Sequence, residues 1–275
     1  MSLPSIGFIG GGNMARSLIG GLIADNYPTE LIRVSDPNAD IRAALSQDFG
    51  IEVVADNQQL VASQAIIVLA VKPQVMPEVA SGIQAPAQQH SPLIVSIAAG
   101  IRSSDLDRWL GGNCHIVRTM PNTPSLVGSG ATGLYANPLV TEEEETSAES
   151  IMRAVGLALW VDDESQIDSV TALSGSGPAY FFLVLEALQQ AGSKLGLEPE
   201  TARLLALQTA YGAAKMALES PEDAATLRQR VTSPGGTTEQ ALKVLEENNI
   251  RDIFDKALAA AAHRSEELAN LFGDK

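Results

Sequence analysis

Two short segments of this chain combine glycines with groups that could bind an anion. In the first, residues 232–242, Pro234 and the glycine pair after it predict a tight turn, and Thr237 with Gln240 fits a capping box that opens a helix. The first N–H groups of such a helix are unpaired and carry the positive end of its dipole, so they could bind a carboxylate or phosphate without an Arg. The alternative is a purely structural helix cap.

The second segment follows an apolar run near the N-terminus and reads Gly10-x-Gly12-x-x-Ala15. Gly10 permits a tight turn, Gly12 lets a pyrophosphate approach the backbone, and Ala15 allows close packing of helix on strand. Another apolar strand, residues 31–35, ends at Asp36, where dinucleotide-binding folds place a ribose-binding acid. Together these features predict a nucleotide site.

The elements that must position these segments alternate between strand and helix through the first part of the chain. We expect residues 1–162 to form an α/β domain, a Rossmann-type doubly wound sheet, because several apolar runs are continuous and so indicate strands covered on both faces. Further strands are expected at residues 53–54, 65–71, 93–98, 115–119, 130–136 and 157–161. From residue 163 the period is helical, which predicts an all-helical domain over 163–275 for substrate binding and dimerisation.

Ligands in this fold bind beyond the carboxyl ends of the strands, which gives a set of expected cofactor contacts. They are Gly10, Gly11, Gly12, Asn13, Met14, Ser35, Asp36, Asn38, Ala70, Val71, Lys72, Pro73, Ala98, Ala99, Pro121 and Asn122. Lys72 follows an apolar strand and could reach either cofactor or substrate, or could instead bind a main-chain carbonyl.

Composition excludes several classes of protein. The 275 residues carry a net charge of -15, so a nucleic-acid partner lacks its electrostatic footprint. Cys114 is the only cysteine, which excludes an intrachain disulfide and a four-cysteine zinc site, and no metal is expected. We found no leader and no apolar run of membrane-span length, so we expect a soluble cytoplasmic protein without a membrane partner.

The chain resembles the pyrroline-5-carboxylate reductase family essentially from end to end. The resemblance rests on residues 7–15, 70–73 (Ala-Val-Lys-Pro), 120–124 (Met-Pro-Asn-Thr-Pro), 173–180 (Leu-Ser-Gly-Ser-Gly-Pro-Ala-Tyr) and 231–242. It implies hydride transfer from NADPH or NADH to the C=N bond of 1-pyrroline-5-carboxylate, giving L-proline in the last step of proline biosynthesis. It also implies a homodimer or a larger ring of dimers.

The resemblance assigns the substrate contacts. It implies that the Thr238 hydroxyl, the proposed proton donor in the family, hydrogen-bonds the ring nitrogen. We expect the substrate carboxylate on the N–H groups of Gly236, Thr237 and Thr238, with Gly235 in the same turn and Ser233 as a further donor. The family resemblance implies that Glu164 contacts the substrate, although an acidic residue in such a turn is more often solvated. The resemblance also implies that Asn57 contacts the coenzyme near its adenosine.

An imine can carry its own proton into the site as an iminium ion, so a strong protein acid is unnecessary. The three histidines fit this, because we expect His90 in a loop, His115 at the wrong end of its strand and His263 in the last helix. Coenzyme choice stays open. Asp36 favours NADH by repelling a 2′-phosphate, whereas many family members prefer NADPH, and Ser35 and Asn38 could bind the phosphate.

Two other functions are compatible with parts of the sequence. A 3-hydroxyacid dehydrogenase of the same plan would need a Lys soon after the glycine-rich segment 175–178, but the next lysine is Lys194. A nucleotide-sensing protein without activity would be expected to have a damaged substrate segment, yet residues 233–238 are intact. Tight NAD(P)H binding without imine turnover would favour this second function.

Overall fold

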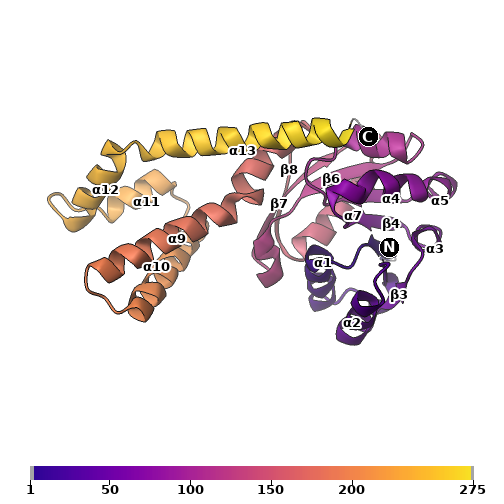
Figure 1. Ribbon diagram of the computed structural model, residues 1–275, viewed down its shortest axis with the longest axis horizontal. Coiled ribbons are helices and arrows are strands. Elements are labelled where there is room, and N and C mark those ends of the chain that lie inside the picture. Colours follow the sequence, from indigo (N-terminus) through magenta and orange to yellow (C-terminus); the bar gives the residue numbers. More distant parts are fainter. Residues whose placement is uncertain (1–2, 274–275) are drawn as a thin grey trace. The chain divides into compact units, whose positions relative to one another are not determined.

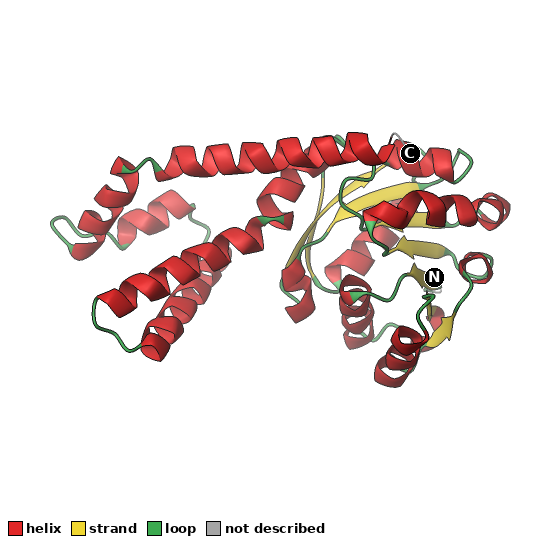
Figure 2. Ribbon diagram, in the orientation of Figure 1, coloured by secondary structure: helices red, strands yellow, loops and turns green. Residues whose placement is uncertain are grey.

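The computed structural model describes residues 3–273, which form two compact units. One unit runs through Ser176 and includes the chain again from Ala260, and the other spans Gly177–Ala259. All strands in the described part of the chain belong to the first unit, whereas the second is made of helices and loops (Figure 2). The compact units thus divide the chain later than the 162/163 boundary expected from the sequence, and part of the last helix packs with the sheet.

The first unit is built on an eight-stranded sheet in the order β3-β2-β1-β4-β5-β6-β7-β8. Figure 1 labels β3, β4, β6, β7 and β8 of this sheet. The strands β1 to β6 pair in parallel, β7 runs antiparallel to β6, and β8 is parallel to β7. Their bounds are β1 Ile6–Ile9, β2 Ile32–Ser35, β3 Glu52–Val54, β4 Ile66–Leu69, β5 Leu93–Ser96, β6 Ile116–Met120, β7 Gly130–Ala136 and β8 Gly156–Trp160. Every expected strand is present within a residue or two at each end.

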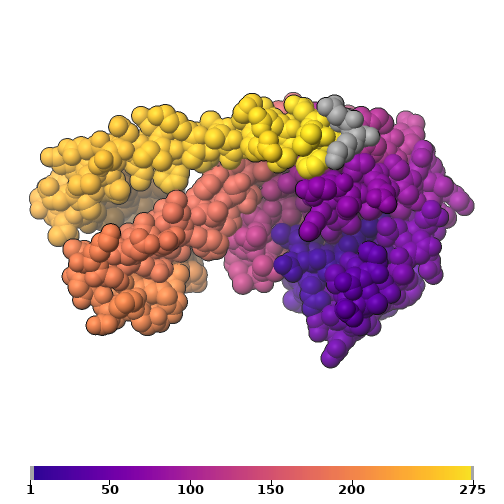
Figure 3. All heavy atoms as spheres, in the orientation of Figure 1, coloured from indigo at the N-terminus to yellow at the C-terminus, as the bar shows by residue number. Residues whose placement is uncertain are grey.

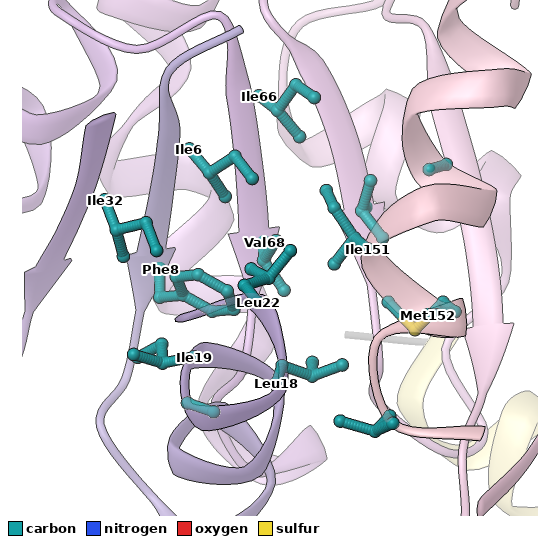
Figure 4. Close-up of a cluster of buried hydrophobic side chains, with 14 of the residues drawn as sticks. Ile6, Phe8, Leu18, Ile19, Leu22, Ile32, Ile66, Val68, Ile151 and Met152 are labelled. Carbon is teal, nitrogen blue, oxygen red and sulfur yellow. The ribbon is translucent and has the colours of Figure 1, made fainter. Parts of the chain in front are cut away.

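Both faces of this sheet are covered, as the continuous apolar strands predict. On one face Ile6 and Phe8 of β1 pack against α1, and Ile151 and Met152 of α7 complete the same cluster (Figure 4). On the other face Ile9 belongs to a second cluster with residues of α3, α4, α5 and α6. Successive strand side chains point to opposite faces, so a strand that is buried on both faces is apolar at most of its positions.

The helices of this unit include several that the sequence did not reveal. Their bounds are α1 Asn13–Ala24, α2 Ala39–Phe49, α3 Asn57–Val61, α4 Met76–Gly82, α5 Gln84–His90, α6 Ser103–Trp109, α7 Glu142–Arg153 and α8 Gln166–Val170, with a π-helical turn, η4, at Thr171–Gly175. Short 3-10 turns are η1 Thr29–Leu31, η2 Pro73–Val75 and η3 Thr123–Val127. The first turn of α7 is acidic, and a complete capping box joins Thr141 and Glu144 at its start.

The second unit holds α9 (Gly177–Lys194), α10 (Pro199–Glu219), α11 (Ala224–Arg230), α12 (Thr237–Glu247) and the first part of α13 (Ile250–Gly273). Large apolar side chains on its helices are exposed, for example Phe181 and Phe182 on α9 and Leu205 on α10. Such faces need a partner surface, which agrees with the prediction of an oligomer.

The last part of α13, coloured yellow toward the C-terminus in Figure 3, packs on the first unit. Phe272 joins the second core cluster, and the Arg102 guanidinium donates to the Asn270 side chain at 2.8 Å. No helix within residues 3–273 is both long and apolar enough to cross a membrane.

Candidate functional site

A cleft of about 860 Å³ opens in the first unit beyond the carboxyl ends of β1, β2 and β4. It is the edge at which ligands of doubly wound sheets bind, and its volume suits a large ligand such as a dinucleotide. Nine of the residues expected from the sequence line it: Gly10, Gly11, Gly12, Ser35, Asp36, Asn57, Ala70, Val71 and Lys72.

Two glycines of the turn between β1 and α1 are required for different physical reasons. Gly10 has φ +100°, and an added Cβ would lie 2.7 Å from the carbonyl oxygen of Ala70, so a side chain there is both strained and obstructed. Gly12 is the N-cap of α1, has φ -69°, and has nothing within 4 Å of an added Cβ. The open space at Gly12 lies where a phosphate could approach the first N–H groups of α1.

Asp36 ties two loops of the cleft together. One carboxylate oxygen accepts the N–H of Gly11 at 2.9 Å and the other accepts the N–H of Asn38 at 2.8 Å, while the side chain of Arg42 donates to the Asp36 carbonyl at 2.6 Å. The residue is only 7% exposed. Because each oxygen already has a main-chain donor, the first consequence of this acid is to fix the glycine turn against the end of β2.

Two further polar contacts of the cleft come from β2 and the α3 start. The Ser35 hydroxyl donates to the Asn57 side-chain oxygen at 2.6 Å, and the preceding residue, Asp56, caps α3. Lys72 is exposed at the end of β4, with no ion pair to an acidic side chain in the described part of the chain. Its charge is therefore free to meet a phosphate.

Sequence reasoning missed the wall that α4 and the loop after β3 contribute. The additional lining residues come from these two segments and from β1, the loop after β2, η2, α2 and α3: Ile9, Pro37, Ile41, Ala55, Asp56, Gln58, Val75, Glu78, Val79 and Gly82. A signal for the α4 wall was present, because Pro73 and Pro77 stand in the first turns of η2 and α4.

The remaining expected cofactor contacts do not line this cleft. Asn13, Met14, Asn38 and Pro73 are chain neighbours of lining residues, whereas Ala98, Ala99, Pro121 and Asn122 follow β5 and β6. The amide of Asn122 donates to the Ser174 carbonyl at 3.0 Å and accepts the N–H of Ala131 at 2.9 Å. Its side chain therefore has a structural role in holding β7 and η4 against the end of β6.

Glu164 lies in a buried polar network. Its carboxylate accepts the N–H and the hydroxyl of Ser103 at 2.6 and 2.7 Å, and the guanidinium of Arg118 at 3.2 Å. Arg118 is 1% exposed and also lies 3.7 Å from Asp168, which accepts the Ser265 hydroxyl at 2.6 Å. Glu164 thus caps α6 and balances a buried cation, and this geometry gives no support to the predicted substrate contact.

The second predicted segment starts α12 in the helical unit, and one detail of its prediction was wrong. The helix begins at Thr237 with Gly236 as N-cap and no side-chain cap, so Thr237 and Gln240 form no capping box. Instead the carboxylate of Glu239 accepts the N–H of Gly235, which has φ +71°, at 2.8 Å. The left-handed conformation of Gly235 makes the turn that leads into the helix, so no capping hydroxyl is needed.

The donors at this helix start can be counted. The N–H of Gly236 donates to the Ser233 carbonyl at 3.0 Å, so it is not free for a ligand as the sequence suggested. The N–H groups of Thr237, Thr238 and Glu239 are the first three of the helix and have no acceptor in its ladder. They form a set of donors at the positive end of an 11-residue helix.

The three histidines and the single cysteine do not line the cleft. The ring of His115, just before β6, contacts Glu144 at 2.7 Å, and His263 lies exposed on α13 near Glu267. His90 ends α5, which corrects its expected place in a loop. Burial raises the pKa of the Cys114 thiol to about 11, so this thiol stays protonated and unreactive at neutral pH. Residues 3–273 hold no cluster of three or more His, Cys, Asp or Glu fit to bind a metal ion.

Family models match both parts of the chain, the part that holds the cleft and the part that holds the α12 start. A family model described as pyrroline-5-carboxylate reductase dimerisation matches residues 164–268, and one described as NADP oxidoreductase, coenzyme F420-dependent, matches residues 5–100. A pyrroline-5-carboxylate reductase of Pseudomonas aeruginosa is 54% identical over 273 residues, covering 99% of this chain and 100% of the relative. The chain belongs to the pyrroline-5-carboxylate reductase family.

Solved structures of reductases from this family have the same fold. The enzyme of Coxiella burnetii matches with a TM-score of 0.95 at 49% identity, covering 98% of this chain and 99% of that one. The Plasmodium falciparum enzyme, solved with NADP bound, matches with a TM-score of 0.85 at 31% identity, covering 98% and 99%. The chain is an NAD(P)-dependent oxidoreductase of proline biosynthesis, and its dimerisation segment identifies it as an oligomer-forming reductase.

Proposed function

We propose that this reductase binds its coenzyme in the cleft of the α/β unit and its substrate carboxylate at the start of α12. The observation that carries the coenzyme site is the glycine turn, because the open space at Gly12 adjoins the first N–H groups of α1 and an otherwise unpaired Lys72 lines the same cleft. Main-chain donors and a single cation can hold a pyrophosphate in a strongly acidic protein.

For the substrate, the free N–H groups of Thr237, Thr238 and Glu239 supply donors for a carboxylate, and Ser233 adds a hydroxyl nearby in the same loop. This set replaces the one inferred from the sequence, because the Gly236 N–H is already bonded within the turn. Anions at a helix N-terminus are stabilised by its dipole, so a 1-pyrroline-5-carboxylate ion needs no Arg partner here.

The reaction is hydride transfer from the nicotinamide to the imine carbon, with the ring nitrogen becoming a secondary amine. The hydride comes from the coenzyme, and the nitrogen enters already protonated as an iminium ion, so product formation requires no strong acid. We assign the Thr238 hydroxyl to hydrogen-bond and orient the ring nitrogen. A threonine hydroxyl is a poor general acid, so its effect is on binding and orientation more than on proton transfer.

Coenzyme choice depends on how Asp36 is used. The acid would repel a 2′-phosphate, but both of its oxygens are committed to main-chain N–H groups, which offset its charge. We therefore propose that the cleft accepts NADPH as well as NADH, which fits the NADP-bound relative from Plasmodium falciparum. Steady-state oxidation of both coenzymes with 1-pyrroline-5-carboxylate, with proline identified as product, tests reaction and preference together. Absence of turnover with either would contradict the proposed reaction.

The oligomer is at least a homodimer in this proposal. The match to the family's dimerisation segment supports it, as do the exposed apolar faces of α9 and α10. A ring of dimers is the larger assembly implied by the family resemblance. Light scattering on the purified protein distinguishes a monomer, a dimer and a ring by mass.

A further inference from the structure

The two edges of the sheet differ in how they are protected. The edge strand β3 has only three residues, and its first, Glu52, forms a 2.8 Å ion pair with Arg33 of the neighbouring strand. The opposite edge strand, β8, has five uncharged residues, Gly-Leu-Ala-Leu-Trp, between Val155 and Val161. Natural edges are kept from pairing with other chains by shortness, charge, proline or cover, and β8 has no charge and no proline.

The side chains of β8 leave one face of the strand apolar and open. Leu157 and Leu159 are 53% and 58% exposed, whereas Ala158 between them is 8% exposed and packs in the first core cluster. Leu157 and Leu159 share a face because strand side chains alternate. Two large exposed aliphatic side chains on an uncharged edge strand indicate a surface that binds another protein surface.

The main-chain groups of β8 indicate which residues are free to pair. The Val155 carbonyl accepts the N–H of Gly130 at 2.8 Å, and the N–H of Val161 donates to the Leu134 carbonyl at 2.8 Å. These odd-numbered residues therefore point their main-chain groups toward β7. Because N–H and C=O groups of successive residues face opposite sides, those of Gly156, Ala158 and Trp160 point away from the sheet.

We propose that β8 pairs antiparallel with β8 of a second copy of this chain and makes one sheet across the two copies. The occupant is a second copy because the matched dimerisation segment starts at residue 164, directly after β8 ends at Trp160. A strand that pairs with itself is also the arrangement that a two-fold axis produces. This interface is independent of the coenzyme and substrate assignments, and it lies outside the helices of the matched dimerisation segment.

The outward main-chain groups fix the register. Hydrogen-bonded pairs must join Gly156, Ala158 and Trp160 with one another, and the register that uses all three places Ala158 opposite the partner's Ala158. Gly156 then lies opposite the partner's Trp160, and Leu157 lies opposite the partner's Leu159. The leucine pairs are non-hydrogen-bonded pairs with Cα atoms about 4.5 Å apart, within the range that a disulfide can bridge.

Disulfide formation tests both the interface and the register. The full-length Leu157→Cys/Leu159→Cys double variant, treated with a mild thiol oxidant, should run as a covalent dimer on a non-reducing gel. Each single variant should stay monomeric on that gel, because Leu157 does not face the partner's Leu157. Both positions are exposed, so the variants should fold, and Cys114 is buried in all of them. Glu52→Cys/Val54→Cys on β3 is the matched control and should give no covalent dimer.

Any other result of the disulfide experiment would overturn either the register or the interface. A covalent dimer from Leu157→Cys alone would overturn the register. Absence of a covalent dimer in the double variant would overturn the interface, whether a thiol reagent then labels both cysteines, which means an open edge, or neither, which means cover by a helix.

A charge swap supplies a second test in solution. Leu157→Lys/Leu159→Lys places like charges opposite each other in both leucine pairs, whereas Leu157→Lys/Leu159→Glu places opposite charges there. The first variant should dissociate to monomer at a protein concentration at least about tenfold higher than the second, measured by sedimentation velocity over a dilution series. Equal dissociation of the two variants would overturn the proposed pairing.

Discussion

Two glycine turns of this protein open helices that present free N–H groups, yet they are held in different ways. At α1 the turn is fixed from outside, because the Gly11 N–H donates to Asp36, which lies 25 residues away in sequence at the end of β2 and is almost fully buried. At α12 the turn is fixed from inside, because the Gly235 N–H donates to Glu239, four residues on, at an exposed position.

The difference suggests how much each turn tolerates change. The α1 turn is part of a buried core, so a disturbance there is transmitted to two strands and to stability. The α12 turn is local and solvated, so a disturbance should change ligand binding while the fold remains. The same anion-binding geometry thus occurs in a rigid setting and in a locally held one.

The largest expected effect comes from Gly10→Ala. Its Cβ would lie 2.7 Å from the Ala70 carbonyl oxygen at φ +100°, so the turn must move. We expect NAD(P)H affinity to fall at least about tenfold and the free energy of unfolding to fall by about 1–3 kcal/mol, the usual cost of such strain.

Gly12→Ala is the matched control for that change. Nothing lies within 4 Å of its Cβ and its φ is -69°, so stability should be retained while the methyl group obstructs the pyrophosphate. Coenzyme titration by fluorescence and chemical denaturation measure the two quantities. Equal loss of stability in both variants would contradict the distinction drawn between the two glycines.

The next effect concerns Asp36→Asn. The amide has one acceptor oxygen, so one of the two main-chain donors from Gly11 and Asn38 loses its partner, at a cost of about 1–3 kcal/mol in unfolding free energy. Removal of the charge should also raise the ratio of NADPH to NADH kcat/KM. Parallel kinetics with both coenzymes measure that ratio, and an unchanged ratio would mean that Asp36 has only the structural role.

These cases show what the sequence could and could not reveal. The Gly10-x-Gly12 spacing and Asp36 predict the cleft because close backbone approach and a strand-end acid are local requirements. The roles of Glu164 and Asn122 were not predictable, because their partners Ser103, Arg118 and Ser174 are distant in sequence and meet them only after folding. The reversed direction of β7 was not predictable either, because the apolar pattern of a strand is the same in a parallel and an antiparallel pairing.

A smaller effect is expected for Thr238→Ala. Loss of the hydroxyl removes one neutral hydrogen bond, worth about 0.5–1.5 kcal/mol, so KM for the imine should rise by up to about tenfold while measurable turnover remains. Thr238→Ser keeps the hydroxyl and should restore most of the affinity. Complete loss of turnover with unchanged KM would instead make the hydroxyl an essential proton donor.

The smallest expected effect is that of Glu239→Gln. The Gln side-chain oxygen can still accept the Gly235 N–H, but the negative charge next to the bound carboxylate is removed. KM for the imine should therefore fall by about twofold at low ionic strength, and the difference should vanish in high salt because exposed charges are screened. Glu247→Gln, at the other end of α12, is the control and should leave KM unchanged. A higher KM in Glu239→Gln would mean that the charged carboxylate is needed to hold the turn, and the α12 turn would then resemble the α1 turn in depending on a full negative charge.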